Sequence, residues 1–222
     1  LYGYAATHED RTLLSTLRKE QYEGFQSRLT GGDTSHKDTT RFPDFGPKKW
    51  NDNTKRSGGI TIGARDILIA YNVNVDEKDA NISKKIGSMV RSSGRLIKRH
   101  NGKKMRIPGM LTKVQGMGVT LEAHNISQVS MNLLDVDSCP LHLAFEACKA
   151  IANDHDLELL GSELVGLVPL KVMLDAGKWY DDNDAESNEE QLVNAAIEGL
   201  GLDHLEPFDA KNRIIEWAVK GS

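Results

Sequence analysis

Apolar side chains take every second position in two segments of the chain, and amide and hydroxyl side chains lie between them from residue 72 onward in the first segment and throughout the second. The alternation runs through residues 67–75 and 128–133, and it predicts β-strands that each have one polar and one apolar face. Uncharged polar groups in the middle of a sheet suit hydrogen bonding to a polar heterocycle or to the backbone of another subunit. They would equally suit water or a packing partner. The polar residues concerned are Asn72, Asn74, Gln128, Ser130 and Asn132.

A second candidate is the segment 161–170, which we expect to leave the last strand of the domain and enter a helix. Its glycines, Gly161 and Gly166, would let the backbone approach a ligand closely, and Glu163 could accept a hydrogen bond from an amino group. A strand-to-helix turn with a solvated glutamate explains the same residues equally well. Composition leaves both interpretations open.

These residues need a sheet to position them, and hydrophobic periodicity predicts one. The element order strand–helix–strand–strand–helix–strand is that of a ferredoxin-like split βαβ unit, so we expect an α+β fold with an antiparallel sheet. In that topology the first and third strands are central neighbours and both helices cover one face, which leaves the polar residues together on the other face. The elements are strands at 67–75, 111–122, 126–133 and 157–160, and helices at 78–92 and around 141–152.

Local signals mark the ends of these elements. We expect Asp76 to cap the first helix and Gly94 to end it. Ser138 is the expected cap of the second helix, with Pro140 in its first turn. The last strand is expected to end at Gly161.

Further elements are expected on both sides of this unit. Residues 8–29 are helical in composition, and residues 30–59 form a long connection of the kind that is usually functional or a linker. Three extra amphipathic helices are predicted at 169–180, 189–200 and 210–219.

Composition excludes several classes of protein. The 222 residues hold two cysteines, Cys139 and Cys148, which lie within one helical pattern and indicate a reducing compartment, so we expect a cytoplasmic protein. There is no apolar run of about 20 residues and hence no predicted membrane span. The seven histidines show no metal-ligand spacing, and no phosphate loop or nucleophile elbow is present. Residues 1–6 read like the end of a buried strand, which predicts a further segment upstream.

Charge is segregated along the chain. Residues 84–113 hold ten lysines or arginines and no acid, whereas residues 181–190 hold six acids and no base. The basic run has no aromatic side chain on which a base could stack, so it does not predict a nucleic-acid site. It predicts a solvated helix face followed by a basic loop, with attraction of a polyanionic small molecule as the functional alternative.

Seven blocks of residues, in order over nearly the whole chain, resemble the formiminotransferase domain. Any one block would be a weak signal, and their succession is a strong one. They lie at 1–3, 18–24, 43–47, 62–65, 68–74, 128–133 and 161–174.

The resemblance implies a glutamate formimidoyltransferase reaction. In that reaction the formimino group of N-formimino-L-glutamate passes to the co-substrate tetrahydrofolate, in histidine catabolism and one-carbon metabolism. It also implies two ferredoxin-like subdomains: residues 1–57 would be the end of the amino-terminal one and a connector, and residues 58–222 the carboxy-terminal one.

The family's general acid/base histidine lies in the amino-terminal subdomain, so we expect it upstream of Leu1 and assign no catalytic or metal-binding residue here. Expected partners are folate, N-formimino-L-glutamate, that missing subdomain and other copies in a homo-oligomer, with neither nucleic acid nor membrane. The alternatives are a non-catalytic folate- or anion-binding module and a structural subunit.

Individual site residues follow from the same resemblance. Residues 46–59 resemble the folate-contacting connector, although 48–57 look longer and more basic than usual. Glu163 falls where the family carries Gln or Glu facing the pterin. Arg65 resembles an anion-binding arginine, whose guanidinium would pair with a carboxylate through two hydrogen bonds, and a structural salt bridge is the alternative. The full predicted set is Phe45, Gly46, Pro47, Gly58, Gly59, Arg65, Asn72, Asn74, Gln128, Ser130, Asn132, Gly161, Ser162 and Glu163.

Overall fold

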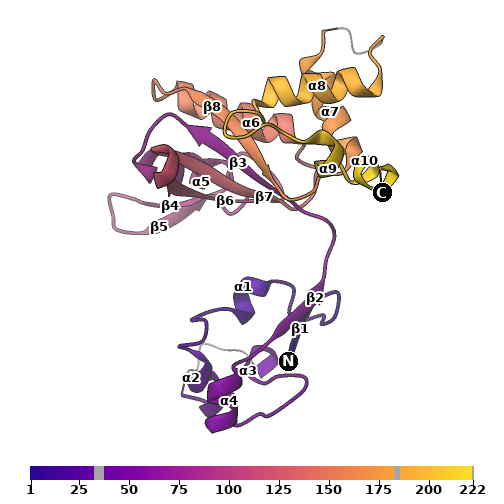
Figure 1. Cartoon of the computed structure of the whole chain (residues 1–222). Helices are drawn as coiled ribbons and strands as arrows, with labels where there is room; N and C mark the ends of the chain where they lie inside the picture. The colour runs from indigo at the N-terminus through magenta and orange to yellow at the C-terminus, as the bar shows by residue number, and fades with distance from the viewer. Residues whose placement is uncertain (33–37, 183–185, 222) are drawn as a thin grey trace. The chain divides into compact units, whose positions relative to one another are not determined.

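The chain divides into two compact units, Leu1–Asp66 and Ile67–Ser222, which are described separately. The computed structural model describes residues 1–32, 38–182 and 186–221 (Figure 1). The first unit extends to Asp66 because strand β2 (Thr61–Ala64) belongs with it. There it pairs in parallel with β1 (Tyr2–Ala5), with Tyr2 opposite Thr61.

The first unit is less helical than its composition predicts. The expected helix at 8–29 is interrupted, because Glu20 and Gln21 adopt positive φ angles that no right-handed helix allows. The long connection at 30–59, in turn, contains two short helices. Asn51 caps the second of these and exchanges hydrogen bonds with Thr54. The helices of the unit are α1 (Leu14–Leu17), α2 (Phe25–Thr30), α3 (Asp38–Arg41) and α4 (Asp52–Ser57).

An ion pair between a buried arginine and a partly exposed aspartate ties the start of the first unit to the segment 43–47. Arg11 is 4% exposed, and its Nη1 lies 2.6 Å from Oδ2 of Asp44, which also accepts a hydrogen bond from the backbone N–H of Gly3 at 2.7 Å. Partial burial would raise the pKa of the Asp44 carboxyl, but the Gly3 N–H and the Arg11 guanidinium outweigh it and hold that pKa below its ordinary value.

We therefore expect Asp44→Asn to lower the free energy of unfolding of the first unit by about 1–3 kcal/mol, because it leaves the Arg11 charge uncompensated. The depressed pKa gives the sign of the pH effect. The contribution of Asp44 is complete above its unfolded-state pKa and is lost as the pH falls through the lower pKa of the folded state. Amide hydrogen exchange of the first unit, followed as a function of pH, measures both the loss of stability and its pH dependence. Asp10→Asn, which removes an exposed carboxylate nearby, is the control, and equal exchange in the two variants would contradict the prediction.

The second unit is built on a four-stranded antiparallel sheet, which confirms the α+β class. Its strand order is β6-β7-β3-β8, so the first and third strands of the unit, β3 and β7, are the central neighbours that a split βαβ order requires. The strands are β3 (Ile69–Val75), β6 (Val114–Leu121), β7 (Ile126–Leu133) and β8 (Leu159–Val165).

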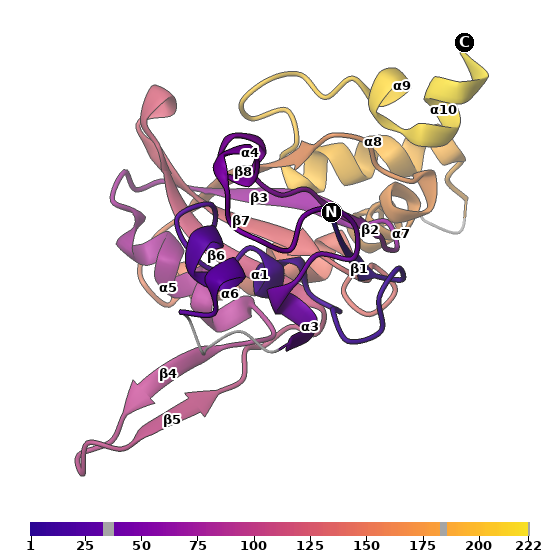
Figure 2. The same cartoon turned by 90° about the horizontal axis from the view of Figure 1, so that it is seen from below.

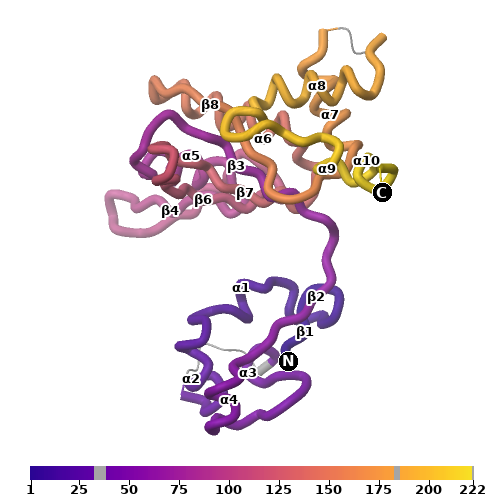
Figure 3. The backbone as a smooth tube through the Cα atoms, viewed as in Figure 1, coloured from indigo at the N-terminus to yellow at the C-terminus, as the bar shows by residue number. Residues whose placement is uncertain are grey.

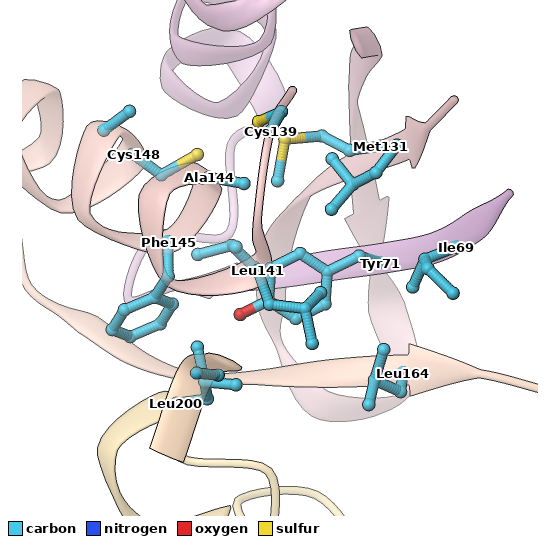
Figure 4. Close-up of a cluster of buried hydrophobic side chains, with 14 of the residues drawn as sticks. Ile69, Tyr71, Met131, Cys139, Leu141, Ala144, Phe145, Cys148, Leu164 and Leu200 are labelled. Carbon is cyan, nitrogen blue, oxygen red and sulfur yellow. The ribbon is translucent and has the colours of Figure 1, made fainter. Parts of the chain in front are cut away.

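Helices α5 (Ala80–Val90) and α6 (Leu141–Asn153) cover one face of this sheet. Gly118 of β6 permits the approach of α5, because a Cβ at that position would lie 2.0 Å from the backbone nitrogen of Lys84. On the same face, Tyr71 and Leu164 of the sheet meet Leu141 of α6 in the main core (Figure 4). The apolar half of the strand alternation therefore makes the core, as predicted.

Two further helices match their predicted ranges closely. These are α7 (Leu170–Tyr180) and α8 (Glu189–Leu200). The expected helix at 210–219 is split into α9 (Ala210–Arg213) and α10 (Ile215–Lys220) by Ile214. This residue is extended and fully buried, and it bridges Val168, so tertiary packing overrides the helical pattern there.

Several predicted boundaries are wrong. Asp79, and not Asp76, caps α5 through the backbone N–H of Asn81. Pro140 stands at the N-cap of α6, while the Ser138 hydroxyl donates to Asp135. The last strand does not end at Gly161 but continues to Val165 after a bulge.

The basic segment is also different from the predicted loop. It folds into a hairpin of β4 (Arg95–Lys98) and β5 (Lys104–Ile107), which projects from the second unit (Figure 2). The turn between β6 and β7 contains the short 3₁₀ helix η1 (Glu122–His124), and the left-handed Asn125 closes it.

Candidate functional site

The predicted polar residues of β3 and β7 lie on one face of the sheet, opposite the helices. Pairing places Asn72 beside Ser130, Asn74 beside Gln128, and Asn132 beside Ala70. Because Glu163 lies within β8 and not in a turn, it joins this face beside Asn72. We call these six residues the polar face: Asn72, Asn74, Gln128, Ser130, Asn132 and Glu163.

Hydrogen bonds join four of these side chains into a network. The Gln128 amide nitrogen donates to Oδ1 of Asn74 at 2.8 Å and to Oε2 of Glu163 at 3.3 Å. The amide nitrogen of Asn72 donates to the same Glu163 oxygen at 3.2 Å. An ionised carboxylate only accepts hydrogen bonds, so Glu163 determines which way the two amides that contact it are turned.

Burial makes this network different from ordinary solvated polar groups. Asn74 is fully buried and Gln128 is 4% exposed, whereas the other four residues of the polar face are half-buried. At the margins of the face, the apolar side chains of Met117 and Val165 are 58% and 52% exposed. The polar face is therefore not sealed by the chain's own hydrocarbon side chains.

The network leaves a defined set of acceptors. Both amide protons of Gln128 take part in the network. Three acceptors have no hydrogen-bond partner among the described residues: the carbonyl oxygen of Gln128, the carbonyl oxygen of Asn72 and the second carboxylate oxygen of Glu163. A ligand with several N–H donors would match this pattern, because each unpaired acceptor that it buries would otherwise lose its water.

One residue that contacts the polar face was not predicted from the sequence. Nδ1 of His204 lies 3.2 Å from Nδ2 of Asn74, although the two residues are 130 positions apart. His204 belongs to the loop between α8 and α9, whose backbone passes beside β8 (Figure 3). No local pattern around His204 indicates this contact.

Two predicted residues of β8 face other parts of the chain. Gly161 was expected to let the backbone approach a ligand, but a Cβ there would meet Gly201 and His204 of the same chain, at 2.5 Å and 2.7 Å. Ser162 is buried on the helix-covered face, where its hydroxyl donates to the carbonyl of Leu200 at 2.7 Å. Neither residue contributes a side chain to the polar face.

The remaining predicted residues belong to the first unit: Phe45, Gly46, Pro47, Gly58, Gly59 and Arg65. Gly58 and Gly59 line a cavity of about 300 Å³ together with Arg18 and Arg28, and none of the described residues that line it is an acid. Arg28 is 4% exposed, and its Nε has no hydrogen-bond partner within the described part of the chain. Such a cavity suits an anionic group.

Arg65 is exposed and takes part in no salt bridge between described residues. The alternative role given to it above, a structural salt bridge, therefore finds no support.

The cysteines offer no nucleophile. Cys139 and Cys148 are both buried and unpaired, and burial raises the pKa of the Cys139 thiol to about 11 and that of Cys148 further. Both thiols are therefore protonated at neutral pH, and a thiol is unreactive in that form.

No group of three or more potential metal ligands occurs among the described residues. In that part of the chain, no helix has both the length and the apolar character that crossing a membrane requires.

Comparison with known proteins identifies the family to which this sheet belongs. A family model for the formiminotransferase domain matches residues 70–220, which include the whole polar face. The chain belongs to the formiminotransferase family.

Its relatives are longer proteins. It is 39% identical to mouse formimidoyltransferase-cyclodeaminase over 224 residues, which cover the whole of this chain and 38% of the mouse protein. It is 33% identical to glutamate formimidoyltransferase of Streptococcus pyogenes and 34% identical to that of Thermoplasma acidophilum, in each case over 81% of this chain and 52% of the relative. This member of the formiminotransferase family thus spans between about a third and about half of the relatives that it matches.

Proposed function

We propose that this chain binds tetrahydrofolate and N-formimino-L-glutamate and takes part in transfer of the formimino group from the second to the first. Membership of the formiminotransferase family supports the reaction class. The observation that carries the proposal is the acceptor-rich polar face around Glu163, because the pterin ring of a folate presents an amino group and ring N–H donors along one edge.

The reaction that we propose is an amidine transfer. The lone pair of a pterin nitrogen forms a bond to the formimino carbon, which becomes tetrahedral as the π pair of its C=N bond moves onto the formimino nitrogen. That pair then re-forms the C=N bond while the bond from the carbon to the glutamate nitrogen breaks, and the electron pair of the broken bond stays with the glutamate nitrogen. One proton leaves the pterin nitrogen and one is delivered to the departing glutamate amine.

The polar face contributes orientation to this chemistry. Holding two substrates in a productive geometry lowers the barrier, since little freedom remains to be lost when they react. A general base that moves the proton would add a factor of about 10² to 10⁴ in rate. In our proposal this base lies outside the polar face, and the chain's own amides and Glu163 hold the pterin.

The arginine-lined cavity of the first unit is the proposed site for a carboxylate. Both substrates carry glutamyl carboxylates, and Arg18 and Arg28 supply positive charge in a cavity that has no acid among its described lining residues. We also propose that residues 1–57 are the end of an amino-terminal subdomain with its connector, that residues 58–222 are the carboxy-terminal subdomain, and that the protein is a cytoplasmic homo-oligomer.

Calorimetric titration of the 222-residue chain with 5-formyltetrahydrofolate, a stable reduced folate, tests the proposal. We expect saturable binding, and we expect no detectable formimino transfer when N-formimino-L-glutamate and tetrahydrofolate are supplied together. Absence of folate binding would refute the proposal. Full turnover by the chain alone would place the base among its own residues. Binding of folate without any effect of added formiminoglutamate would favour the alternative, a non-catalytic folate-binding module.

A further inference from the structure

His204 occupies a position from which it controls the hydrogen bonds of the polar face. Its Nδ1 lies 3.2 Å from Nδ2 of Asn74, which is completely buried and is therefore dependent on partners within the protein. Buried amides almost always satisfy their hydrogen-bonding groups, because an unsatisfied one costs about 1–3 kcal/mol.

The loop that carries His204 is attached to β8 at several points. The backbone N–H of Ser162 donates to the carbonyl of Gly201 at 3.0 Å, and the Ser162 hydroxyl donates to that of Leu200 at 2.7 Å. Gly161 has a φ of +145° and no side chain, and this leaves the space that the Cβ of His204 occupies. His204 is thus held against the polar face by its own backbone.

The chain of hydrogen bonds determines the state of the His204 ring. Glu163 can only accept, so Gln128 turns its amide nitrogen toward Glu163, and the same nitrogen donates to Oδ1 of Asn74. The Asn74 amide nitrogen must then point toward His204. Because that nitrogen is a donor, Nδ1 of His204 has to accept, and a neutral ring carries its proton on Nε2.

A second proton on the ring would break this arrangement. Both ring nitrogens of a protonated histidine are donors, so Nδ1 would face the Asn74 amide donor. Turning the Asn74 amide over would relieve that conflict but would place its nitrogen against the amide nitrogen of Gln128. Either way, one buried amide loses its partner.

We propose that neutral His204 is a positioning residue: by accepting from Asn74 it stabilises the orientation of Asn74 and Gln128 that Glu163 requires, and so keeps Glu163 in place as the acceptor for the ligand's N–H groups. The proposal rests on the proposed function, because it assigns the ligand to the polar face.

The surroundings of the His204 ring contain three carboxylates. Glu198 of α8 and Asp203 of the loop line the same surface pocket as His204, and Glu163 lies at the other end of the hydrogen-bond network. The neighbours of the ring on β3 and β8, Asn74 and Gly161, are uncharged. Histidines gain their charge between about pH 8 and pH 5, so ligand binding should weaken as the pH falls through that interval.

The first test requires no ligand. Long-range ¹⁵N–¹H correlation spectra of the full chain at pH 8 report which ring nitrogen of His204 carries the proton. We expect the Nε2–H form, and an Nδ1–H form would overturn the proposal. The side-chain amide resonances of Asn74 and Gln128 should move with pH at the midpoint of the His204 ring. Amide resonances that stay unchanged through that midpoint would also overturn it.

The second test is the affinity for 5-formyltetrahydrofolate from pH 8 to pH 5.5. We expect the wild-type affinity to fall by about 5–10-fold more than that of His204→Gln, whose side-chain oxygen accepts from Asn74 at every pH. Any change in the protonation of the free ligand affects both proteins equally, so it cancels when their affinities are compared. His100→Gln, in the basic hairpin, is the control and should keep the wild-type profile. Parallel profiles of wild type and His204→Gln would contradict the proposal. Loss of folate binding at every pH in all variants would instead refute the proposed function, and the ring tautomer would still decide the role of His204.

Discussion

Glu163→Leu is expected to lower the affinity for a reduced folate by about 100-fold. The leucine removes the carboxylate that accepts from Asn72 and Gln128 and that remains as the acceptor for the ligand. A hydrogen bond to a charged group contributes about 1.5–3 kcal/mol, and the two amide donors are left without their partner as well. Titration calorimetry with 5-formyltetrahydrofolate measures the effect.

Two further variants separate this role from a general loss of charge or of folding. Glu163→Gln keeps an oxygen that accepts from both amides and should cost less than about 10-fold in affinity. Glu158→Leu removes an exposed carboxylate just before β8 and should bind like the wild type. An unchanged affinity in Glu163→Leu, with a normal circular dichroism spectrum, would show that the ligand does not use the polar face.

Among substitutions that add a single methyl group to the sheet, Gly118→Ala is expected to be the most destabilising. Its Cβ would lie 2.0 Å from the backbone nitrogen of Lys84 and 2.3 Å from the carbonyl carbon of Ser83, so helix α5 would have to move away from β6. Overpacking of a core costs about 1–3 kcal/mol when side chains can yield, and here only backbone is available to yield. We therefore expect a loss of about 3 kcal/mol or more in the free energy of unfolding, measured by urea denaturation.

Gly116→Ala is the matched control for this change. It lies two residues away on the same face of the same strand, and its Cβ would meet the nearest atom, the carbonyl oxygen of Gly87, at 3.2 Å. We expect a loss of less than about 1 kcal/mol there. Equal stability of the two variants would mean that α5 does not pack against β6 as closely as the structure shows.

The sheet and its two faces could be predicted from the sequence because the signal is local. Side chains alternate along a strand for covalent reasons, so each strand's polar residues were assigned to one face of that strand, and the expected split βαβ order placed both sets on the face without helices. These residues are Asn72, Asn74, Gln128, Ser130 and Asn132. The range of α8 followed from an amphipathic pattern at 189–200, which is equally local, and the structure adds the caps Asn188 and Gly201. The structure places the predicted polar residues together because β3 pairs directly with β7.

Other predictions failed where distant contacts decide the outcome. A glycine such as Gly161 is typical of the end of a strand, yet β8 contains a bulge beside it and continues to Val165. Ile214 sits in a helical pattern, yet its pairing with Val168 breaks the helix. In both cases hydrogen bonds to another element outweigh a local preference of a few tenths of a kcal/mol to about 1 kcal/mol per residue.

By itself, then, the sequence determined an α+β chain with a polar sheet face, and its resemblance to a family indicated the kind of reaction. Only the tertiary structure brought Glu163 beside Asn72 and folded the loop of His204 against Asn74. The physical reason is that the direction of a side chain depends on its own strand, whereas the partners that turn an amide and select a ring tautomer come from residues far away along the chain.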